Sequence, residues 1–352
     1  MERREQVKPV GFAVVGLGMG NNRARQLMNE AEQGEIVRLL GVCDLLEEKA
    51  RAAGEKYGVP WSTDYRRFLD DPEVEVIYVV TETGRHAKVA IDALEAGKHV
   101  LSTKPMEASL EAAYRELLAA RKNRRSLAVD FDKRHTSATA QRIAYAIKQG
   151  YLGRILVGDS SLRTLRTPEY FAHNGGWRGT WALDGGGAMS NQAIHEIDLL
   201  YSFLGMPEKV EGRIWTQNHD IEAEDLGMGV WYYHDNKVGF VRATTCWPPG
   251  GWYARHELHG TEGAVIWSEA PQADEKWFLG GKWLDSAPDF PVDTTSATVR
   301  FARHIRFGDP MPVDGEEGLR SLAVLKAMYE SFRRGAAVSP RELLAGLEQG
   351  NH

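Results

Sequence analysis

Residues 10–24 of this 352-residue chain read VGFAVVGLGMGNNRA. The apolar run at 12–15 predicts a β-strand that is buried on both faces, as in a parallel sheet. Gly16 permits a sharp turn, and Gly18 lacks a Cβ, so a pyrophosphate can approach the backbone. A helix that we expect to begin near Asn21 directs its N–H groups and its positive dipole end at that phosphate. The stretch therefore predicts a strand, turn and helix that bind a dinucleotide.

The turn departs from the usual glycine pattern at one position. The third glycine of the pattern falls on Asn21, and Gly20 stands one place earlier. We expect this change to loosen the packing of the helix on the strand without abolishing phosphate binding. A plain surface turn remains the alternative on this motif alone. The cofactor contacts that we expect here come from Gly16, Leu17, Gly18, Met19, Gly20 and Asn21.

An acidic residue follows the second predicted strand. This strand covers residues 36–43 and ends at Asp44, where a carboxylate would bind the ribose hydroxyls of the adenosine half. A cap for the helix predicted over 45–57 is the alternative role of Asp44. Leu45 comes next, and no adjacent Arg or Lys neutralises a 2′-phosphate. We therefore expect NAD, with NADP less favoured.

Composition excludes several classes of protein. The formal net charge of −6 argues against nucleic acid or an anionic membrane as a partner. Cys43 and Cys246 are the two cysteines, which predicts neither a disulfide framework nor a zinc site, and we expect no metal. Residues 1–9 are charged and contain no apolar segment, so we expect no signal peptide. No apolar run approaches the roughly 20 residues that span a bilayer. A reducing, cytoplasmic location fits these features.

The order of predicted elements divides the chain into two domains. Up to residue 133, strands alternate with helices, which predicts a Rossmann-type, doubly wound parallel sheet of the α/β class. Loops at the carboxyl ends of its strands would bind the ligand. Over 134–352 we expect an α+β domain whose partly alternating strands form a large, open, mostly antiparallel sheet. The strands predicted there cover residues 153–159, 209–216, 226–233, 238–246, 253–259 and 264–268, and the helices 138–149, 192–204 and 316–334.

Two further stretches carry a family resemblance. Residues 103–105 read TKP, and residues 185–198 read GGGAMSNQAIHEID. Together with the nucleotide-binding turn, they resemble the signatures of the Gfo/Idh/MocA family of oxidoreductases over nearly the whole chain. The resemblance implies that 1–133 binds the dinucleotide, and that 134–352 binds substrate and self-associates into a homodimer or homotetramer. It also adds Thr81, Thr83, His86 and Lys104 to the expected cofactor contacts.

Lys104 is the first expected catalytic residue. The family has Glu-Lys-Pro at this place, with its lysine beside the nicotinamide, and here Thr103 replaces the glutamate. A cation near a developing alkoxide lowers the cost of oxidising an alcohol. The alternative is a solvated lysine that precedes a helix.

Asn191 and His195 form the second expected catalytic pair. The family often has Asp-x-x-x-His here, and residues four apart share one helical face. His195 would take the hydroxyl proton as hydride leaves and return it in the reduction. Asn191 cannot ionise, so we expect it to bind the substrate and, without an adjacent carboxylate, His195 to be neutral at pH 7. A core histidine and a helix N-cap are the respective alternatives, and Asp198 is expected to be structural.

The expected substrate is a small carbohydrate or polyol. Trp177 precedes Arg178, and an aromatic face beside a charged donor suits a sugar or cyclitol ring. The residues expected to bind substrate are Lys104, Trp177, Arg178, Asn191 and His195. Together these features predict an NAD-dependent dehydrogenase that acts on a secondary alcohol of a sugar, a sugar derivative or an inositol-like polyol. An NAD-dependent redox glycosidase or lyase and a non-catalytic NAD-binding regulator are the alternatives.

Overall fold

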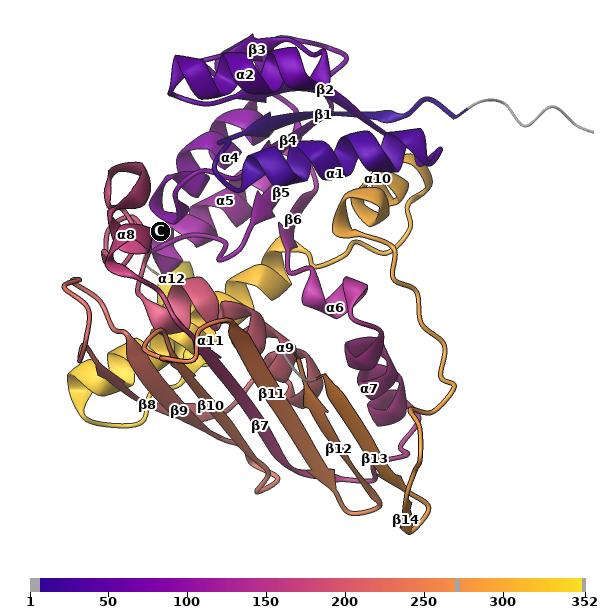
Figure 1. Cartoon of the computed structure of the whole chain (residues 1–352), viewed down its shortest axis with the longest axis vertical. Coiled ribbons are helices and arrows are strands. Elements are labelled where there is room, and N and C mark those ends of the chain that lie inside the picture. Colours follow the sequence, from indigo (N-terminus) through magenta and orange to yellow (C-terminus); the bar gives the residue numbers. More distant parts are fainter. Residues whose placement is uncertain (1–6, 270–272, 350–352) are drawn as a thin grey trace, which may run out of the picture. The chain divides into compact units, whose positions relative to one another are not determined.

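The chain folds into two compact units, which the computed structural model describes over residues 7–269 and 273–349 (Figure 1). The first unit contains the chain up to Glu107, together with Ala112–Asp130 and Thr295–Glu316. The second contains Ala108–Glu111, Phe131–Thr294 and the chain from Glu317 onward. Most of the segment 1–9, on which the expectation about a signal peptide rests, lies outside the described residues.

The first unit is built on a six-stranded parallel sheet. Its strand order is β3-β2-β1-β4-β5-β6, so the order reverses between β1 and β4, where a doubly wound sheet binds its ligand. Every residue of β1 is buried, which explains its uninterrupted apolar sequence. The strands are β1 (Val10–Val15), β2 (Val37–Cys43), β3 (Trp61–Ser62), β4 (Val76–Val79), β5 (His99–Thr103) and β6 (Leu127–Asp130). The helices are α1 (Gly20–Glu32), α2 (Glu47–Tyr57), α3 (Arg66–Leu69), η1 (Thr83–Arg85), α4 (His86–Glu95) and α5 (Leu110–Asn123). The predicted Rossmann architecture is confirmed.

A late segment of the chain returns to the first unit. Helix α10 (Ala297–Phe307) contributes Phe301, which is fully buried in the core of this unit. The hydroxyls of Ser296 and Thr298 each donate to the Glu30 carboxylate at 2.6 Å. The observed division therefore differs from a single boundary at 133/134. The chain crosses after Asp130 and comes back, because the apolar face of α10 completes the first core.

The second unit is built on an eight-stranded mixed sheet of order β14-β13-β12-β11-β7-β10-β9-β8. Within this sheet, β7 and β10 form the one parallel pair among the described strands, and the other pairs are antiparallel. The strands are β7 (Ile155–Thr164), β8 (Lys209–Trp215), β9 (Leu226–Tyr232), β10 (Val238–Thr244), β11 (Trp252–Gly260), β12 (Gly263–Ser268), β13 (Asp274–Leu279) and β14 (Lys282–Trp283). The remaining helices are α6 (Lys133–Thr136), α7 (Ala138–Lys148), α8 (Pro168–Ala172), η2 (His173–Gly175), η3 (Ala188–Gln192), α9 (Ile194–Leu204), α11 (Gly315–Arg334) and α12 (Pro340–Gln349). The predicted open, mostly antiparallel sheet is confirmed.

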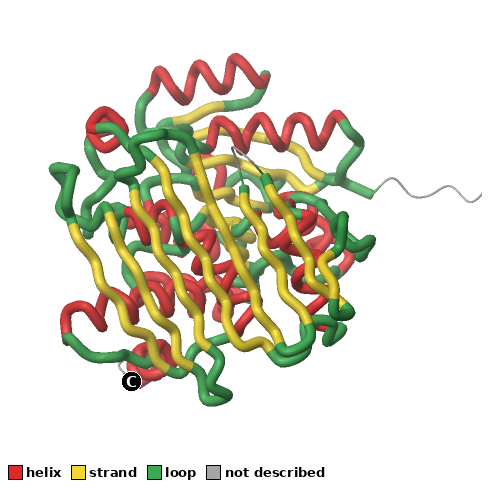
Figure 2. The backbone as a smooth tube through the Cα atoms, turned by 60° about the horizontal axis from the view of Figure 1, so that its bottom comes forward, coloured by secondary structure: helices red, strands yellow, loops and turns green. Residues whose placement is uncertain are grey.

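Helices cover one face of this sheet and leave the other uncovered (Figure 2). Gly212 of β8 allows α11 to approach closely, since a Cβ there would lie 2.3 Å from the Met328 carbonyl oxygen. On the uncovered face, Trp215, Met228, Tyr232 and Phe240 are exposed. Among the described helices, none is both long and apolar enough to cross a membrane.

Candidate active site

The turn after β1 needs glycine at two of its positions. Gly16 has φ of 92°, and a Cβ there would lie 2.5 Å from the Val80 carbonyl oxygen. Gly20 is buried as the first residue of α1, where a Cβ would meet the Val14 side chain at 3.1 Å. Gly20 thus provides the close packing of helix on strand. The expectation of loosened packing is wrong, because α1 begins one residue earlier than we predicted.

Asn21 and Asp44 fix the surroundings of this turn. The Tyr57 hydroxyl donates to the Asn21 side-chain oxygen at 2.9 Å and so ties α1 to α2. Asp44 accepts from the Leu17 amide at 2.8 Å and from the Leu46 amide at 2.9 Å. Each carboxylate oxygen keeps a second lone pair for a ribose hydroxyl. The first turn of α1 has no acidic residue. The glycine-rich turn, this helix end and the acid after β2 together fit a dinucleotide.

The loops after β4 and β5 are joined by His86. This histidine is fully buried, with Nδ1 at 3.1 Å from the Pro105 carbonyl oxygen and Nε2 at 3.1 Å from that of Thr81. Burial lowers the pKa of His86, although the hydrogen bonds to the carbonyl oxygens of Thr81 and Pro105 act in the opposite direction. Thr83 is also buried, whereas Lys104 is half-buried directly after β5. The direct cofactor contacts of these residues stay predictions. The structure shows His86 as a link between the two loops.

His195 lies in the first turn of α9, in the second unit, near a carboxylate. Its Nδ1 is 3.6 Å from Asp132 Oδ1, which is ion-pair range but longer than a hydrogen bond. The Phe131 ring meets the imidazole edge-on, with centroids 6.2 Å apart. The expectation that His195 has no adjacent carboxylate is therefore wrong. Asp132 is 63 positions earlier in the chain (195 minus 132), and only its place just after the strand 127–130 could have pointed to it.

Asn191 lies in a π-helical turn, η3, rather than in α9. Its side-chain Nδ2 donates to Asp184 Oδ1 at 2.6 Å, and its Oδ1 accepts from Gln192 at 2.7 Å and from the Tyr170 hydroxyl at 3.3 Å. The N-cap of α9 is Ala193, so the alternative of Asn191 as its cap is wrong. Asp184, which is buried, holds the amide in one orientation.

Asp198 is structural, as expected. Its carboxylate receives two hydrogen bonds of 2.6 Å from the Arg134 guanidinium and one of 2.6 Å from the Ser321 hydroxyl. These contacts join α6, α9 and α11 inside the second unit and leave Asp198 buried.

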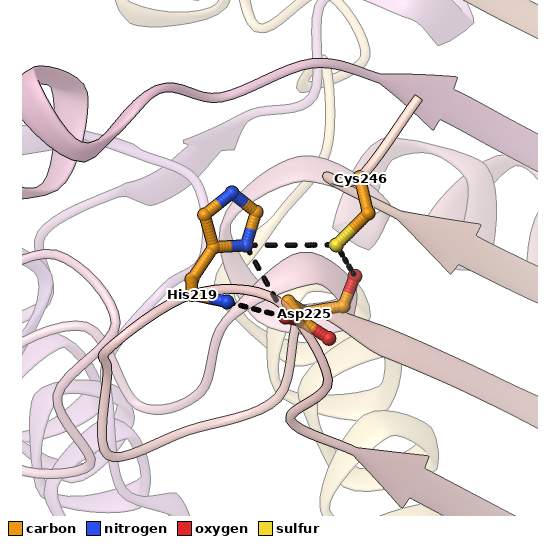
Figure 3. A group of neighbouring side chains, drawn as sticks. All are labelled: His219, Asp225 and Cys246. Carbon is orange, nitrogen blue, oxygen red and sulfur yellow. Dashed lines mark hydrogen bonds and ion pairs between the residues drawn. The ribbon is translucent and has the colours of Figure 1, made fainter. Parts of the chain in front are cut away.

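His219, Asp225 and Cys246 meet in a cluster that the sequence spacing did not predict (Figure 3). Their potential ligand atoms lie within 4.8 Å of one another, a spacing that a metal ion needs. However, Asp225 Oδ2 already accepts from the amides of residues 217, 218 and 219 at 2.7 to 3.0 Å. Burial raises the pKa of the Cys246 thiol to about 11, which opposes the thiolate that a metal requires. The cluster is therefore better explained as a structural one, in which Asp225 holds the turn at residues 217–219 in place.

Trp177 and Arg178 follow η2 and pack together. The Arg178 guanidinium carbon lies 4.7 Å from the centroid of the Trp177 ring and 4.7 Å from that of Tyr170. Tyr170 donates to Asn191, so this aromatic group is connected to the segment that carries His195.

Comparison with known proteins gives consistent matches along the chain. Residues 10–131 match the model of an oxidoreductase family with an NAD-binding Rossmann fold, and residues 140–266 match the GFO/IDH/MocA C-terminal domain. Levoglucosan dehydrogenase of Pseudarthrobacter phenanthrenivorans is 28% identical over 330 residues, which cover 83% of this chain and 82% of that protein. The scyllo-inositol 2-dehydrogenase (NAD(+)) of Bacillus subtilis is 26% identical over 343 residues, or 94% of this chain and 96% of that protein.

A solved structure is similar over most of the chain. The WlbA dehydrogenase from Bordetella pertussis, in complex with NADH and UDP-GlcNAcA, has a TM-score of 0.83 and 29% identity. The match covers 94% of this chain and 99% of that one. With the glycine turn, the TKP loop and the GGG…HEID segment all in place, the chain belongs to the Gfo/Idh/MocA family of oxidoreductases.

Proposed function

We propose that this protein is an NAD-dependent dehydrogenase that oxidises a secondary alcohol of a sugar, a sugar derivative or an inositol-like polyol, or reduces the matching ketone. The proposal rests on the carboxylate of Asp132, which lies 3.6 Å from His195 Nδ1. A carboxylate at this place stabilises the protonated imidazole, so His195 is suited to accept a proton from the substrate. The names of the levoglucosan and scyllo-inositol dehydrogenases support the substrate class.

The cofactor would be held by the first unit. The glycine turn and the start of α1 would bind the pyrophosphate, and Asp44 the adenosine ribose. His86 would act indirectly, by fixing the loop that carries Lys104. NAD, when bound, accepts the hydride.

The remaining steps belong to side chains of this protein. Lys104 would stabilise the negative charge that develops on the substrate oxygen. His195 would accept the hydroxyl proton at Nε2, because Nδ1 faces Asp132, which stabilises the imidazolium that forms. Asn191, oriented by Asp184, would bind a neighbouring hydroxyl, and Trp177 would cover one face of the ring.

The test is NADH formation at 340 nm across a panel of sugars, sugar acids and inositols, with NAD and NADP side by side. Asp132→Asn should lower kcat by about 10- to 100-fold while NAD affinity stays unchanged. His195→Ala should abolish turnover, and Asp235→Asn, an exposed carboxylate between β9 and β10, is the matched control. Cleavage without net NADH would instead indicate a redox glycosidase or lyase. NAD binding without turnover of any member would indicate a regulator.

The proposal extends to self-association as a homodimer or homotetramer and to a cytoplasmic location. The exposed Met228, Tyr232 and Phe240 on the uncovered sheet face support the first, and the two free cysteines support the second. Light scattering after size exclusion should give a multimer that Phe240→Glu dissociates. Phe332→Glu, an exposed aromatic on α11, should leave the multimer intact. A monomeric wild-type protein would refute this part of the proposal.

A further inference from the structure

Two guanidinium groups flank one half-buried tyrosine next to the proposed active site. The guanidinium carbons of Arg166 and Arg178 each lie 4.7 Å from the centroid of the Tyr170 ring. The Tyr170 hydroxyl contacts Asn191 at 3.3 Å and Gln192 at 2.8 Å. Burial raises the pKa of Tyr170 although both arginines oppose this, so its hydroxyl stays neutral and supplies no negative charge.

Neither arginine has an acidic partner among the described residues. Arg166 donates to the neutral Gln192 side chain at 2.6 Å. Within the described part of the chain, the Arg178 guanidinium contacts only the rings of Tyr170 and Trp177. Arg166 Nε and Arg178 Nη1 are buried without a hydrogen-bond acceptor in the described part of the chain. The neighbouring Asp184 carboxylate is already bonded to the Gly179 amide and to Asn191.

This arrangement differs from that of Arg134, another half-buried arginine of the same unit. Arg134 binds Asp198 through two hydrogen bonds of 2.6 Å. Positive charges that are withdrawn from water are ordinarily matched by an anion, because an unpaired one is costly. Arg166 and Arg178 therefore present two positive charges that no carboxylate among the described residues of the unit binds in an ion pair.

The position of Arg166 is fixed by the backbone around it. Its carbonyl oxygen accepts from His219 Nε2 at 2.8 Å, and its amide donates to the Thr245 carbonyl at 2.9 Å. His219 is in turn held at 3.2 Å from Asp225 within the cluster of Figure 3. Groups that are held in place before binding lose less entropy when a ligand arrives.

From this geometry we propose that the substrate carries an anionic oxygen group, a carboxylate or a phosphate, which Arg166 and Arg178 bind beside Asn191. This inference rests on the proposed function and narrows it to acidic sugars or sugar phosphates. The planar guanidinium fork matches both oxyanions through paired hydrogen bonds. Asn191 precedes His195 by four residues, so the anion and the reacting hydroxyl would belong to one small molecule.

Binding to the NADH complex of the intact protein tests the inference by calorimetry. The probes are matched series of neutral sugars, their uronates and their phosphates, for example D-glucose, D-glucuronate and D-glucose 6-phosphate. At least one anionic sugar should bind with an affinity at least about tenfold higher than that of its neutral parent. Arg178→Gln and Arg166→Gln should each remove that advantage, and Arg178→Lys should restore part of it. The series that binds more tightly than its neutral parent sugars, uronates or phosphates, identifies the anionic group of the substrate.

Arg163→Gln is the matched control, because Arg163 also packs on two aromatic rings, those of Trp247 and Tyr253. It should leave the anion advantage intact. A second measurement does not require the sugar substrate to be known. Malonate and inorganic phosphate should raise the Tm of the wild type relative to chloride at equal ionic strength, and neither arginine-to-glutamine variant should respond. Equal binding of neutral and anionic sugars together with an arginine-independent Tm response would overturn the inference.

Turnover measured in parallel separates this inference from the proposed function. If neutral sugars and their anionic counterparts are oxidised with equal kcat/KM, and Arg178→Gln changes neither value, the dehydrogenase proposal stands and the anion site is refuted. If anions bind in an arginine-dependent way but no polyol is oxidised, the anion site stands and the dehydrogenase proposal fails.

Discussion

Replacing Asn191 with Asp tests how the π-helical turn η3 (Ala188–Gln192) is held in place. The Asn191 amide nitrogen donates to Asp184 Oδ1 at 2.6 Å, and Asp184 is 1% exposed. Asn191→Asp removes the donor and places two carboxylates at hydrogen-bond distance. Like charges so close cannot both ionise out of water, so one of the pair must take up a proton. We expect the variant to be destabilised, although it brings the sequence nearer to the usual family pattern.

The magnitude follows from the bond that is lost. A hydrogen bond to a charged group contributes about 1.5–3 kcal/mol, and each unit by which a carboxyl pKa rises costs about 1.4 kcal/mol. The proton held between the carboxylates restores part of the bond, so we expect a net loss of about 2–3 kcal/mol at pH 7. The folded-state pKa of the pair would lie above the unfolded value. The loss is therefore absent below about pH 4, grows as pH rises toward the folded pKa and is constant above it.

Urea unfolding followed by tryptophan fluorescence measures this loss in the right part of the molecule. Trp61 is the one tryptophan of the first unit and the other nine of the ten lie in the second, so the signal reports on the second unit. Wild type and Asn191→Asp should differ at pH 7.5 and converge at pH 4.5. The matched control is the double variant Asn191→Asp with Asp184→Asn, which exchanges donor and acceptor. It should recover at least about 1 kcal/mol of the loss.

The reasoning is refuted if Asn191→Asp is as stable as wild type at pH 7.5. It is also refuted if the double variant is no more stable than the single one, since the loss would then have a source other than the pair of carboxylates.

Three other groups lead to measurable effects. Burial lowers the pKa of His99 to about 4, and the Ser126 amide donates to its Nδ1, so protonation on acidification breaks this bond. The free energy of unfolding should therefore fall by about 2 kcal/mol from pH 7 to 4.5 in circular-dichroism titrations, a loss that His99→Gln removes and whose persistence there would contradict the assignment. Burial, with the nearby Glu107, raises the pKa of Glu116 well above its usual value, and both Glu116 carboxyl oxygens lack a partner among the described residues. Glu116→Met should raise the Tm by about 2–6 °C, and a lower Tm would show that the carboxyl stabilises its site. Chelation should leave the Tm unchanged, with less than about 0.1 zinc per chain by elemental analysis; stoichiometric zinc would instead make Cys246 a metal ligand.

Local sequence was enough to predict the parts of the fold whose signal is local. The apolar run before Gly16 and the glycines after it gave the strand–turn–helix unit, because burial on both faces and positive φ each demand particular residues. The alternation over residues 226–233 and 238–246 placed β9 and β10 within a few residues, since one face of that sheet is covered. The catalytic roles of His195 and Lys104 came from the family signatures and stay predictions.

What the sequence did not predict depends on contacts between distant residues. Helix α10 is amphipathic, but nothing in residues 297–307 tells which core its Phe301 will enter. The strand β13 was missed because Asp274, Glu275 and Lys276 interrupt its alternation. The carboxylate of Asp132 and the cluster around His219 are likewise brought together only by the fold.

The exchange of the usual aspartate for Asn191 is explained by its neighbours rather than by a loss of catalysis. Asp184 is buried and accepts from the Gly179 amide, so it needs a second donor, and an amide at position 191 supplies one that a carboxylate cannot. A negative charge near the imidazole is then provided from another element, by Asp132 beside His195 Nδ1. If this account is correct, Asp132→Asn should cost more in kcat than Asp184→Asn, although Asp184 is the more deeply buried of the two. A larger loss of kcat in Asp184→Asn would mean that the Asp184 carboxylate acts through Asn191. The aspartate–histidine pair of the family would then be kept here, with Asn191 placed between its two members.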